Sequence, residues 1–406
     1  MFKLVVLKTR IYFEVWQNKE VFVKVRIILR FSFFLVMTIG LVLDSDIDFP
    51  GGVQTFVKGL YNYIVQRGGT AIILTSGVIG KSEEAGFKIK RLGSAKTLPG
   101  NGTEVSFFAD WIDKDYIRSL IREEKISLLH IQGLFGLLGM RFLDVKMVPS
   151  LASFHNFVEA DKFPTVLKLF FPLLKYYIDK LDYRVASSLT ARKLAQEIAP
   201  GNYEVIPPGV DVNFFARGEK KRAWPADWIE ILFVGRLDER KGLFYLLKAY
   251  SLLEKKDLPV ALTVIGRGPQ QEGAQSFVKK NNLQRVKFLG FVPDDTLAAH
   301  YRGADIYCSP ATRGECFGIV LIEAMAARLP IVAFHNPGYI NVLRGLGRKF
   351  LIPNRNYQAL AQALEFLVRR PRWRERLSEW SWREVQQYDW QQVGERYWRI
   401  YESLIK

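Results

Sequence analysis

Short apolar runs alternate with longer stretches of helical periodicity from Met37 onwards. In the first half, the runs with the length and content of buried strands are 38–43, 70–76, 126–132, 149–155 and 183–188. The stretches between them, such as 53–69 and 114–125, repeat apolar residues every three or four positions, as amphipathic helices do. Strands that alternate with helices predict a parallel, doubly wound α/β sheet.

The same alternation begins again after a short link. The link "VIPPGVD", residues 205–211, carries paired prolines and a glycine that end any helix. Beyond it the predicted strands are 229–236, 261–268, 286–292, 304–310 and 330–334. The pattern predicts two doubly wound, Rossmann-like domains, 37–208 and 209–387, followed by an aromatic-rich helix at 388–406. Because ligands of open α/β sheets bind beyond the carboxyl ends of the strands, we expect a ligand cleft between the domains.

The first 36 residues lie outside this alternation. They carry seven Lys or Arg against Glu14 and Glu20, and the uncharged run that follows, Phe31–Leu43, is 13 residues long. That run is shorter than the roughly 20 residues that span a bilayer, and no small-residue cleavage site of a signal peptide follows it. We expect residues 1–36 to be a basic and apolar arm outside the fold. An upstream stretch included by a misplaced start codon and a membrane-contacting arm are the alternatives.

The composition of the 406 residues is that of a globular protein, 49% hydrophobic and 24% charged. Cys308 and Cys316 are its two cysteines, so no disulfide framework is expected and a reducing, cytosolic compartment is favoured. The formal net charge of +17 favours an anionic partner, such as nucleic acid, a phosphorylated substrate or anionic lipid. General basicity of a soluble protein explains the charge equally well.

Two glycines follow the first predicted strand and open the first predicted helix. Gly51 and Gly52, in "DFPGGVQTFV", let the backbone approach a ligand, and the free N–H groups of a helix start favour an anion. The alternative is a tight turn that requires positive φ. The six-position glycine fingerprint of dinucleotide-binding proteins is absent here, which argues against an NAD enzyme.

Two cations follow the first strand of the second predicted domain, in "FVGRLDERKG". Arg236 ends the strand, and Lys241 precedes the next helix. Such a pair can clamp a diphosphate, Arg through its planar fork and Lys as a point charge. The alternative is solvated surface charge, which suits Glu239 and Arg240 better than Arg236.

Histidines lie in two strands of the first predicted domain. His155 ends the 149–155 run, where it could hydrogen-bond a sugar hydroxyl or a developing charge, and His130 lies in the 126–132 run. From the residues alone, both are more simply explained as hydrogen-bonded structural histidines.

The segment "GECFGIVLIEAMA" joins a loop to a helix that is apolar around nearly its whole circumference. Glu315 falls just before that helix and Glu323 lies eight residues on, so the two could contact opposite ends of a ligand about 12 Å long. A carboxylate that accepts two hydrogen bonds suits the vicinal hydroxyls of ribose or a hexose. Gly318 leaves room for a ligand in the first turn. The alternative for Glu323 is an ion pair on a buried helix.

Together these motifs resemble the family-4 retaining glycosyltransferases of GT-B architecture, and most closely the bacterial phosphatidylinositol mannosyltransferases. The resemblance runs from about Met37 to the C-terminus and rests on "PGGVQTFV", "LPGNGTEVSF", "LLHIQ", "IPPGVDV", "GR…KG", "VIGRGP", "FLGFV" and "ADIYCSPATRGECFGIVLIEAMAA". It implies transfer of a mannose- or glucose-type hexosyl group from a nucleoside-diphosphate sugar, with retention at the anomeric carbon. It also implies that the helix at 388–406 crosses back to the first domain.

The resemblance implies roles for individual residues. Glu315 and His155 would lie at the donor sugar, Glu323 at the nucleotide ribose, and Arg236 and Lys241 at the diphosphate. The other residues it places at the donor are Gly51, Gly52, Gly235, Gly266, Phe317, Gly318, Ile319 and Val320, and those on the acceptor side are Gln54 and Asn101. His130 has no counterpart and stays structural.

The implied chemistry needs no cofactor and no metal. Arg236, Lys241 and helix-terminal N–H groups would stabilise the negative charge of the leaving diphosphate, and closure of the domains would exclude water. No metal-binding cluster of Asp, His or Cys stands out in the sequence. Two residues depart from the family pattern: Cys316 stands where a small or polar residue is usual, and Arg328 replaces a common glycine.

The acceptor is predicted from residues 161–184, which are apolar with interspersed lysines, as in helices that lie on anionic membranes. A core helix with solvated lysines is the alternative. With the basic charge, the segment favours a peripheral enzyme at the cytoplasmic face of a membrane that acts on a lipid or lipid-linked glycan. A soluble glycan or sugar-phosphate acceptor is the alternative.

Two other functions stay open at this point. A nucleotide-sugar epimerase of the same fold would need no acceptor. A nucleic-acid-binding protein would use the positive charge, but the sequence contains no such module and does not interleave aromatics with Arg in a stacking pattern, so we expect no nucleic-acid partner. The sequence does not choose among GDP-mannose, UDP-glucose and UDP-N-acetylglucosamine as the donor.

Overall fold

The computed structural model describes residues 2–7, 10–17, 20–25, 37–49, 51–77, 83–84, 86–100, 103–108, 110–133, 136–155 and 168–405. The chain divides into two compact units, Met1–Met37 and Thr38–Lys406. The first unit contains the antiparallel strands β1 (Phe2–Leu7), β2 (Arg10–Gln17) and β3 (Glu20–Val25). The pattern of apolar and polar residues did not predict these strands.

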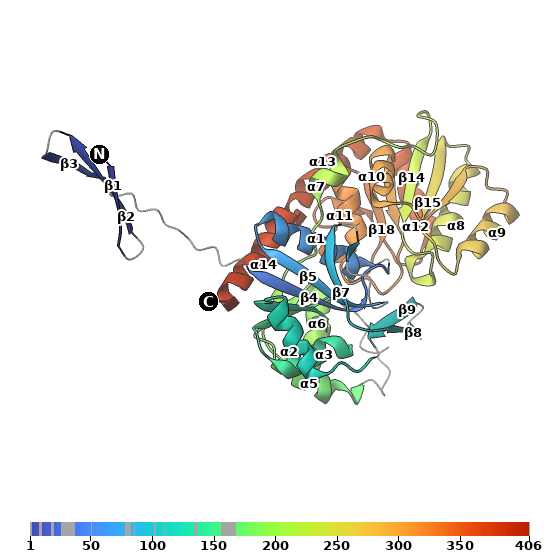
Figure 1. Ribbon diagram of the computed structural model, residues 1–406. Coiled ribbons are helices and arrows are strands. Elements are labelled where there is room, and N and C mark those ends of the chain that lie inside the picture. Colours follow the sequence, from blue (N-terminus) through green and yellow to red (C-terminus); the bar gives the residue numbers. More distant parts are fainter. Residues whose placement is uncertain are drawn as a thin grey trace. The chain divides into compact units, whose positions relative to one another are not determined.

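The second unit begins with a mostly parallel sheet. Among the described residues its strands lie in the order β13-β12-β11-β10-β4-β5-β7-β6 (Figure 1). Their bounds are β4 (Thr38–Asp46), β5 (Thr70–Ser76), β6 (Glu83–Glu84), β7 (Phe87–Arg91), β10 (Leu128–Gln132), β11 (Ser150–Phe154), β12 (Tyr183–Ala186) and β13 (Glu204–Val205). The strands from β13 to β7 pair in parallel, and β6 pairs with β7 antiparallel. A separate hairpin, β8 (Ala95–Gly100) and β9 (Thr103–Phe108), was not predicted from the sequence.

Helices connect the parallel strands of this first sheet. Within the described ranges they are α1 (Gly52–Gln66), α2 (Lys114–Glu123), α3 (Leu137–Val145), α5 (Phe171–Asp179) and α6 (Leu189–Ile198). Side-chain caps start two of them: Asp113 accepts hydrogen bonds from the backbone of α2, and Ser188 accepts one from the N–H of Ala191 in α6.

The second sheet lies wholly in the continuously described range 168–405 and is parallel throughout. Its order is β16-β15-β14-β17-β18-β19, with bounds β14 (Ile229–Val234), β15 (Val260–Ile265), β16 (Val286–Gly290), β17 (Ile306–Ser309), β18 (Ile331–Phe334) and β19 (Leu351–Ile352). Its helices are α7 (Val212–Ala216), η2 (Glu239–Lys241), α8 (Leu243–Glu254), α9 (Gln271–Lys280), α10 (Asp294–Gly303), α11 (Ile319–Ala326), η3 (Tyr339–Asn341), η4 (Gly347–Phe350), α12 (Tyr357–Val368), α13 (Pro371–Val385) and η5 (Gln386–Tyr388). The Thr38–Lys406 unit therefore contains two Rossmann-like domains.

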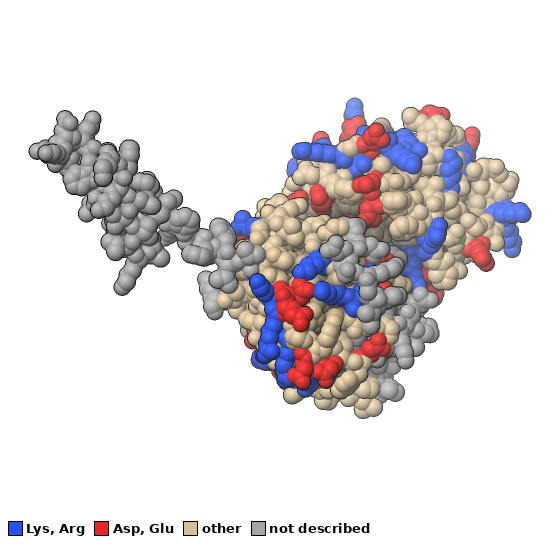
Figure 2. Space-filling view, viewed as in Figure 1, with Lys and Arg blue, Asp and Glu red and all other residues tan. Residues whose placement is uncertain are grey.

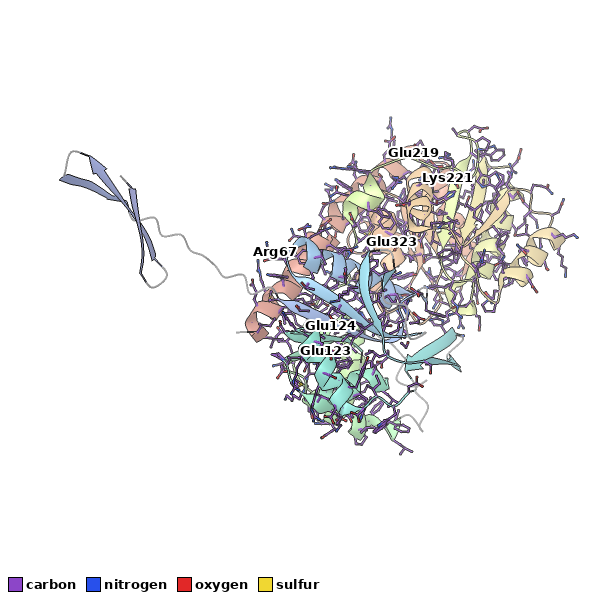
Figure 3. All side chains as sticks on the ribbon, in the orientation of Figure 1. Arg67, Glu123, Glu124, Glu219, Lys221 and Glu323 are labelled. Carbon is purple, nitrogen blue, oxygen red and sulfur yellow. The ribbon has the colours of Figure 1, made fainter. Side chains whose placement is uncertain are left out.

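The last helix, α14 (Trp390–Ile405), packs against α1 of the first domain (Figure 1). Arg67, the residue that follows α1, lies over the Trp398 ring, 5.9 Å from its centroid, and forms an ion pair with Glu395 at 3.4 Å; Figure 3 labels Arg67 beside α14. A Cβ on Gly59 would lie 2.4 Å from the Trp390 ring, so that glycine permits the close approach of the two helices. The helix predicted at 388–406 thus leaves the second domain and covers the first.

The central strands are buried on both faces, which is why they read as continuous apolar runs. Every residue of β10, β11, β15, β17 and β18 is buried. On the visible face of the Thr38–Lys406 unit, Lys and Arg side chains are interspersed with Asp and Glu (Figure 2). Within the described residues, no helix combines the length and the apolar content needed to cross a bilayer.

Candidate functional site

The glycine loop of the first domain faces the start of α11 in the second. A Cβ built on Gly52 would lie 3.2 Å from the side chain of Ile319, the first residue of α11. Two sequence motifs separated by more than 260 positions are therefore brought together. Both lie where strands end: the loop follows β4, and α11 follows β17. This contact fixes the place at which the two domains meet.

The backbone at Gly51 and Gly52 is not a positive-φ turn. Gly51 is extended, with φ −174°, and caps α1 at its N-terminus without a side-chain hydrogen bond, and Gly52 is the first helical residue. Neither glycine is among the positive-φ residues, so the tight-turn alternative is wrong. A Cβ on Gly51 would lie 2.5 Å from Oε1 of Gln54. The N–H groups at the start of α1 therefore have no side-chain cap.

Gly235 and Gly266 lie at the carboxyl ends of adjacent strands, β14 and β15. Both have positive φ, 156° and 132°, and a Cβ on Gly266 would lie 1.9 Å from the carbonyl oxygen of Gly235. Side chains are therefore excluded where these two backbones meet, and the carboxyl edge of the sheet stays open beside Arg236. The predicted strand 229–236 ends two residues early, at Val234, because the backbone departs from the sheet at Gly235.

Arg236 follows this glycine and lies toward the first domain. Its guanidinium carbon is 5.9 Å from the ring centroid of Phe49, which precedes the Gly51–Gly52 loop. Lys241 ends η2 and is followed by Gly242, whose φ is 72°. A Cβ on Gly242 would lie 2.0 Å from a backbone oxygen, so a larger residue there would displace the turn that carries Lys241.

Glu315 and Lys241 form an ion pair. The Lys241 Nζ donates to Glu315 Oε1 at 2.6 Å, and Glu315 is buried, with 8% of its surface exposed. Two residues that the sequence assigned to different parts of a donor thus contact each other directly. A partly desolvated carboxylate held by one ammonium keeps a fixed position and retains acceptor capacity on its second oxygen.

The segment after Glu315 combines core residues with a strained helix start. The Phe317 side chain is buried against Tyr388, with ring centroids 5.5 Å apart, so its backbone is the part that can meet a ligand. Gly318 caps α11 with φ 101°, and a Cβ there would lie 2.5 Å from the Tyr339 ring. The helix begins at Ile319, so the N–H groups of Ile319 and Val320 belong to its first turn.

Glu323 lies on α11 as a buried carboxyl (Figure 3). The Tyr301 hydroxyl of α10 donates to Glu323 Oε2 at 3.0 Å. In the described part of the chain no Lys or Arg forms an ion pair with Glu323, so the structure does not bear out the ion-pair alternative. Burial raises the pKa of Glu323 to about 7, although the Tyr301 hydrogen bond opposes the rise. Nothing in the sequence pointed to Tyr301.

We expect donor binding to depend on pH through Glu323. Because the raised pKa leaves Glu323 protonated below about pH 7, and a diol needs the ionised carboxylate as acceptor, a ligand that binds the ionised form must displace a proton. The affinity for a nucleotide sugar should fall as pH decreases from 8 to 6, by up to about tenfold per pH unit below the pKa. Calorimetry in buffers of different ionisation enthalpy measures this proton release. A Glu323→Gln variant should bind more weakly with no such dependence; an unchanged pH profile in that variant would contradict the assignment.

His155 follows β11 and is held by the neighbouring strand. Its Nε2 lies 3.0 Å from Oε1 of Gln132, the last residue of β10, and its ring packs on Phe56 of α1 with centroids 4.7 Å apart. Burial lowers the pKa of His155 to about 4, so the ring is neutral at physiological pH.

His130 is fully buried on β10, two residues before Gln132, and it holds the C-terminal helix against the sheet. Its Nδ1 lies 2.8 Å from the Tyr401 hydroxyl, and its Nε2 lies 2.7 Å from the Ser153 hydroxyl, which is 3.1 Å from the hydroxyl of Tyr397. Burial holds the pKa of His130 well below its usual value. This network joins α14 to the first sheet, as the structural reading of His130 requires.

Of the two residues predicted on the acceptor side, the structure describes one. Gln54 is buried in α1, and its Nε2 donates to the Ser45 hydroxyl at 2.9 Å and to the Asp46 carbonyl at 3.3 Å. It therefore fixes the end of β4 beside the glycine loop. Asn101 lies outside the described residues.

Cys316, which the sequence left unexplained, crosses from the second domain to the first. Its Sγ lies 3.3 Å from the Ser188 hydroxyl and 3.7 Å from that of Ser187, and the side chain packs against the core of the first domain. A second contact lies nearby, where Thr190 donates to the Pro337 carbonyl at 2.9 Å. Since Glu315 is the preceding residue, its position is tied to this contact between domains. Long-range contacts of this kind leave no local signal in the sequence.

We expect ligand binding to protect Cys316 from thiol reagents. Cys308 is completely buried, so reaction with a maleimide reports on Cys316. Because the Cys316 thiol contacts Ser187 and Ser188 of the first domain, we expect it to react faster when the domains separate. If labelling requires an open cleft, a nucleotide sugar at ten times its Kd should slow it about tenfold. A Cys316→Ser variant serves as the control and should not be labelled. A labelling rate that is independent of ligand would contradict this role for the contact.

The other departure from the family pattern, Arg328, also has a structural reason. It follows α11 with φ 61°, a conformation that favours glycine. Its guanidinium carbon lies 4.2 Å from the ring centroid of Trp382 on α13. This cation–π contact offsets part of the backbone cost of a side chain at that position.

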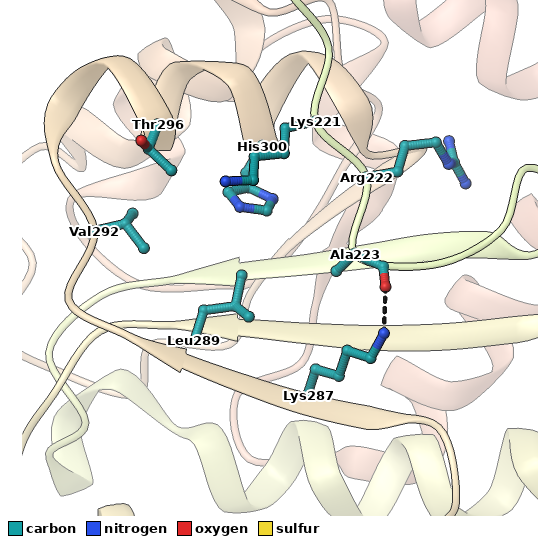
Figure 4. A pocket seen from close by; sticks show the side chains of 8 residues that line it. All are labelled: Lys221, Arg222, Ala223, Lys287, Leu289, Val292, Thr296 and His300. Atoms are coloured by element: carbon teal, nitrogen blue, oxygen red, sulfur yellow. Dashed lines mark hydrogen bonds between the residues drawn. The ribbon is translucent and has the colours of Figure 1, made fainter.

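A pocket of about 300 Å³ lies away from these residues, between α10 and β16 (Figure 4). Its lining includes none of the predicted site residues and consists of Lys221, Arg222, Ala223, Lys287, Leu289, Val292, Thr296 and His300. Two of its cations are already engaged: Arg222 binds Asp305 at 2.8 Å, and Lys287 donates to the Ala223 carbonyl. We therefore do not count this pocket as part of the candidate site.

Two family models match the chain along most of its length. The model described as Glycosyltransferase Family 4 matches residues 50–214, and the model described as Glycosyl transferases group 1 matches residues 216–381. The boundary between the matches falls in the segment that connects the two sheets.

Curated relatives align over nearly the whole chain. The phosphatidyl-myo-inositol mannosyltransferase of Mycobacterium leprae is 31% identical over 372 residues, which cover 91% of this chain and 97% of the relative. The protein of the same name from Mycolicibacterium smegmatis is 30% identical, with coverage of 91% and 94%. A GDP-mannose-dependent alpha-(1-6)-phosphatidylinositol monomannoside mannosyltransferase of Mycobacterium tuberculosis is 27% identical, with coverage of 80% and 88%.

Solved structures share the fold at lower identity. Sucrose-phosphate synthase from Thermosynechococcus elongatus superposes with a TM-score of 0.69 at 20% identity and covers 91% of this chain and 99% of its own. Anabaena HepE in complex with UDP and glucose gives a TM-score of 0.70 at 15% identity, with coverage of 91% and 100%.

Proposed function

Because this chain belongs to the group 1 and family 4 glycosyltransferases of GT-B architecture, we propose that it transfers a hexosyl group from a nucleoside-diphosphate sugar to a lipid or lipid-linked glycan at a membrane, with retention at the anomeric carbon. The observation that carries this proposal is the convergence of Lys241 and Glu315 beside the start of α11, where that helix faces the glycine loop. The names of the relatives support a mannosyl donor and a phosphatidylinositol-type acceptor.

The contacts of the site suggest how the reaction proceeds. As the bond from the sugar to the diphosphate breaks, negative charge grows on the leaving group, and Arg236 and Lys241 would bind it together with the N–H groups of α11. Lys241 would then exchange its contact with Glu315 for the phosphate, which frees Glu315 for a sugar hydroxyl. Glu323 would bind the ribose hydroxyls. In this proposal the protein's own cations neutralise the diphosphate, and no metal takes part.

A peripheral membrane contact is supported by α5. The predicted segment 161–184 is not one helix: residues 161–167 lie outside the described residues, and β12 begins at Tyr183. Within it, Leu174 and Ile178 face the core. Large apolar side chains are nevertheless exposed, namely Leu169, Phe170, Leu173 and Tyr176, and they lie among the exposed lysines Lys168 and Lys175. Exposed apolar residues with adjacent cations suit an anionic bilayer surface.

Transfer is tested with the full chain and labelled GDP-mannose, UDP-glucose and UDP-N-acetylglucosamine. The true donor at 100 times its Kd should add about 2.7 kcal/mol to the free energy of unfolding, which a thermal-shift series detects. Label should then pass to phosphatidylinositol in vesicles, with the α-configuration of the donor kept in the product. Transfer to soluble glycans would show that the acceptor is not a lipid. Isomerisation of the donor without an acceptor would show that the reaction is not a transfer. Failure of every nucleotide sugar to bind would overturn the proposal.

Membrane contact is tested by co-sedimentation with anionic and with neutral vesicles. The double variant Phe170→Ser and Leu173→Ser should lose binding to anionic vesicles while it keeps its melting temperature, because both side chains are exposed. Val65→Ser removes a similarly exposed apolar side chain from α1 and is the matched control. Equal binding by the wild type, the double variant and Val65→Ser would show that α5 does not contact the membrane.

A further inference from the structure

Gln132 is buried at the carboxyl end of β10, and both ends of its amide are engaged. Its Nε2 donates to the carbonyl of His130 at 3.4 Å, and its Oε1 lies 3.0 Å from Nε2 of His155. A backbone carbonyl only accepts hydrogen bonds, so the amide nitrogen must face it. The amide oxygen then faces His155, and the orientation of Gln132 follows from its partners.

This orientation determines which nitrogen of His155 carries the proton. An amide oxygen cannot donate, so the hydrogen bond at 3.0 Å requires a proton on Nε2 of His155. The neutral ring has a single proton, and Nδ1 is then left unprotonated. The ring is neutral because it is partly desolvated against Phe56 and meets no carboxylate partner in the described part of the chain.

The groups around this pair leave the tautomer undisturbed. Among the described residues, His130 on β10 interacts electrostatically with His155, and Tyr397 and Tyr401 on α14 contact His130 in turn. Burial lowers the pKa of His130 and raises the pKa of both tyrosines, so all three are uncharged near neutral pH. Both ring nitrogens of His130 already have hydroxyl partners. No neighbour in this set therefore supplies a charge that would protonate His155.

We propose that Gln132 is a positioning residue that holds His155 as the neutral Nε2–H tautomer, so that the ring offers Nδ1 as a hydrogen-bond acceptor to a hydroxyl of the bound sugar or acceptor. The inference rests on the proposed glycosyltransferase reaction, in which His155 lies at the donor sugar. It extends that function because it assigns an acceptor role to the ring and excludes His155 as a proton donor through Nε2. No proton is transferred in this step: the substrate hydroxyl donates a hydrogen bond to Nδ1 and keeps its proton.

The tautomer is measured directly from imidazole ¹⁵N–¹H correlation spectra of the ¹⁵N-labelled full chain. The protein has four histidines, and a His155→Gln variant identifies the signals of His155. We expect a neutral Nε2–H ring at pH 7 in the wild type. In Gln132→Glu the added carboxylate should raise the pKa of His155 and protonate both nitrogens, and in Gln132→Leu the two neutral tautomers should mix. An Nδ1–H ring in the wild type, or the same spectrum in Gln132→Leu as in the wild type, would overturn the proposal.

Kinetics then separates positioning from a merely structural role. Both Gln132 variants should lower kcat about tenfold or more with little change in the KM for the donor, since the error is one of orientation within a bound complex. Gln275→Leu, at an exposed position of α9, is the matched control and should leave both constants unchanged. Unchanged kcat in a variant whose tautomer has changed would refute the role in the reaction. If the wild type transfers no sugar while its spectra are as expected, the proposed function fails and the tautomer assignment stands.

Discussion

Replacing Glu315 by glutamine is expected to lower the rate of sugar transfer by about 10²- to 10³-fold, the usual loss when one electrostatic contact to a transition state is removed. The carboxylate is buried and bound to Lys241 at 2.6 Å, so its charge sets the position of the lysine, and in the proposed reaction the same carboxylate binds the sugar. Glutamine keeps the shape but removes the charge. Initial rates with a labelled donor measure the loss.

The control for this prediction is an exposed pair in the same part of the chain. Glu239 forms an ion pair with Arg313 at 3.0 Å, and its side chain is 68% exposed. Glu239→Gln removes a comparable charge and should change neither the rate nor the melting temperature measurably, because exposed ion pairs contribute roughly 0–1 kcal/mol. Glu315→Gln should retain its fold, as judged by circular dichroism. A folded Glu315→Gln variant with near-normal turnover would exclude Glu315 from the reaction.

Much of the fold could be read from the sequence because parallel sheets bury their strands on both faces. Such strands appear as continuous apolar runs, and every predicted strand, from 38–43 to 330–334, coincides with a strand of the structure. Several of the missed strands in the Thr38–Lys406 unit lack that signal. The sequence of β7, "FKIKR", alternates apolar and basic residues, and β13 and β19 are two residues long. Alternation in β7 was a usable signal, whereas two-residue strands have none.

The sequence indicated where several candidate site residues lie relative to the strands, but it did not indicate the contacts between these residues. Arg236, His155 and Glu315 follow β14, β11 and β17 in the order that the pattern indicates. The ion pair of Lys241 with Glu315 joins positions 74 apart, and the contact of Ser188 with Cys316 joins positions 128 apart. The first pair depends on how the loops after β14 and β17 of the second domain pack together, and the second pair depends on how the two domains meet. Local periodicity encodes neither. Tyr301 and Gln132 were missed for the same reason, since each acts through another side chain.

Arg236 provides the second large expected effect, because the geometry of its side chain matters as well as its charge. The guanidinium lies at the carboxyl edge of the second sheet, 5.9 Å from the Phe49 ring beside the glycine loop. A planar fork can bind two phosphate oxygens at once, whereas an ammonium binds as a point charge. We therefore expect Arg236→Lys to lower kcat/KM by roughly 10²-fold and Arg236→Ala to lower it further.

The comparison between these two variants distinguishes clamping of the diphosphate from simple attraction. If Arg236 acts through its fork, the lysine variant should lose most of the rate although it keeps the positive charge, and its affinity for the nucleoside diphosphate should fall in parallel by calorimetry. Arg369→Ala serves as the control for removal of one cation. This variant breaks an exposed ion pair with Glu365 in the last turn of α12. A lysine variant with wild-type kcat/KM would show that charge alone suffices at this position. The leaving group would then be stabilised by the sum of nearby cations, Lys241 among them, and a bidentate clamp would have no part in it.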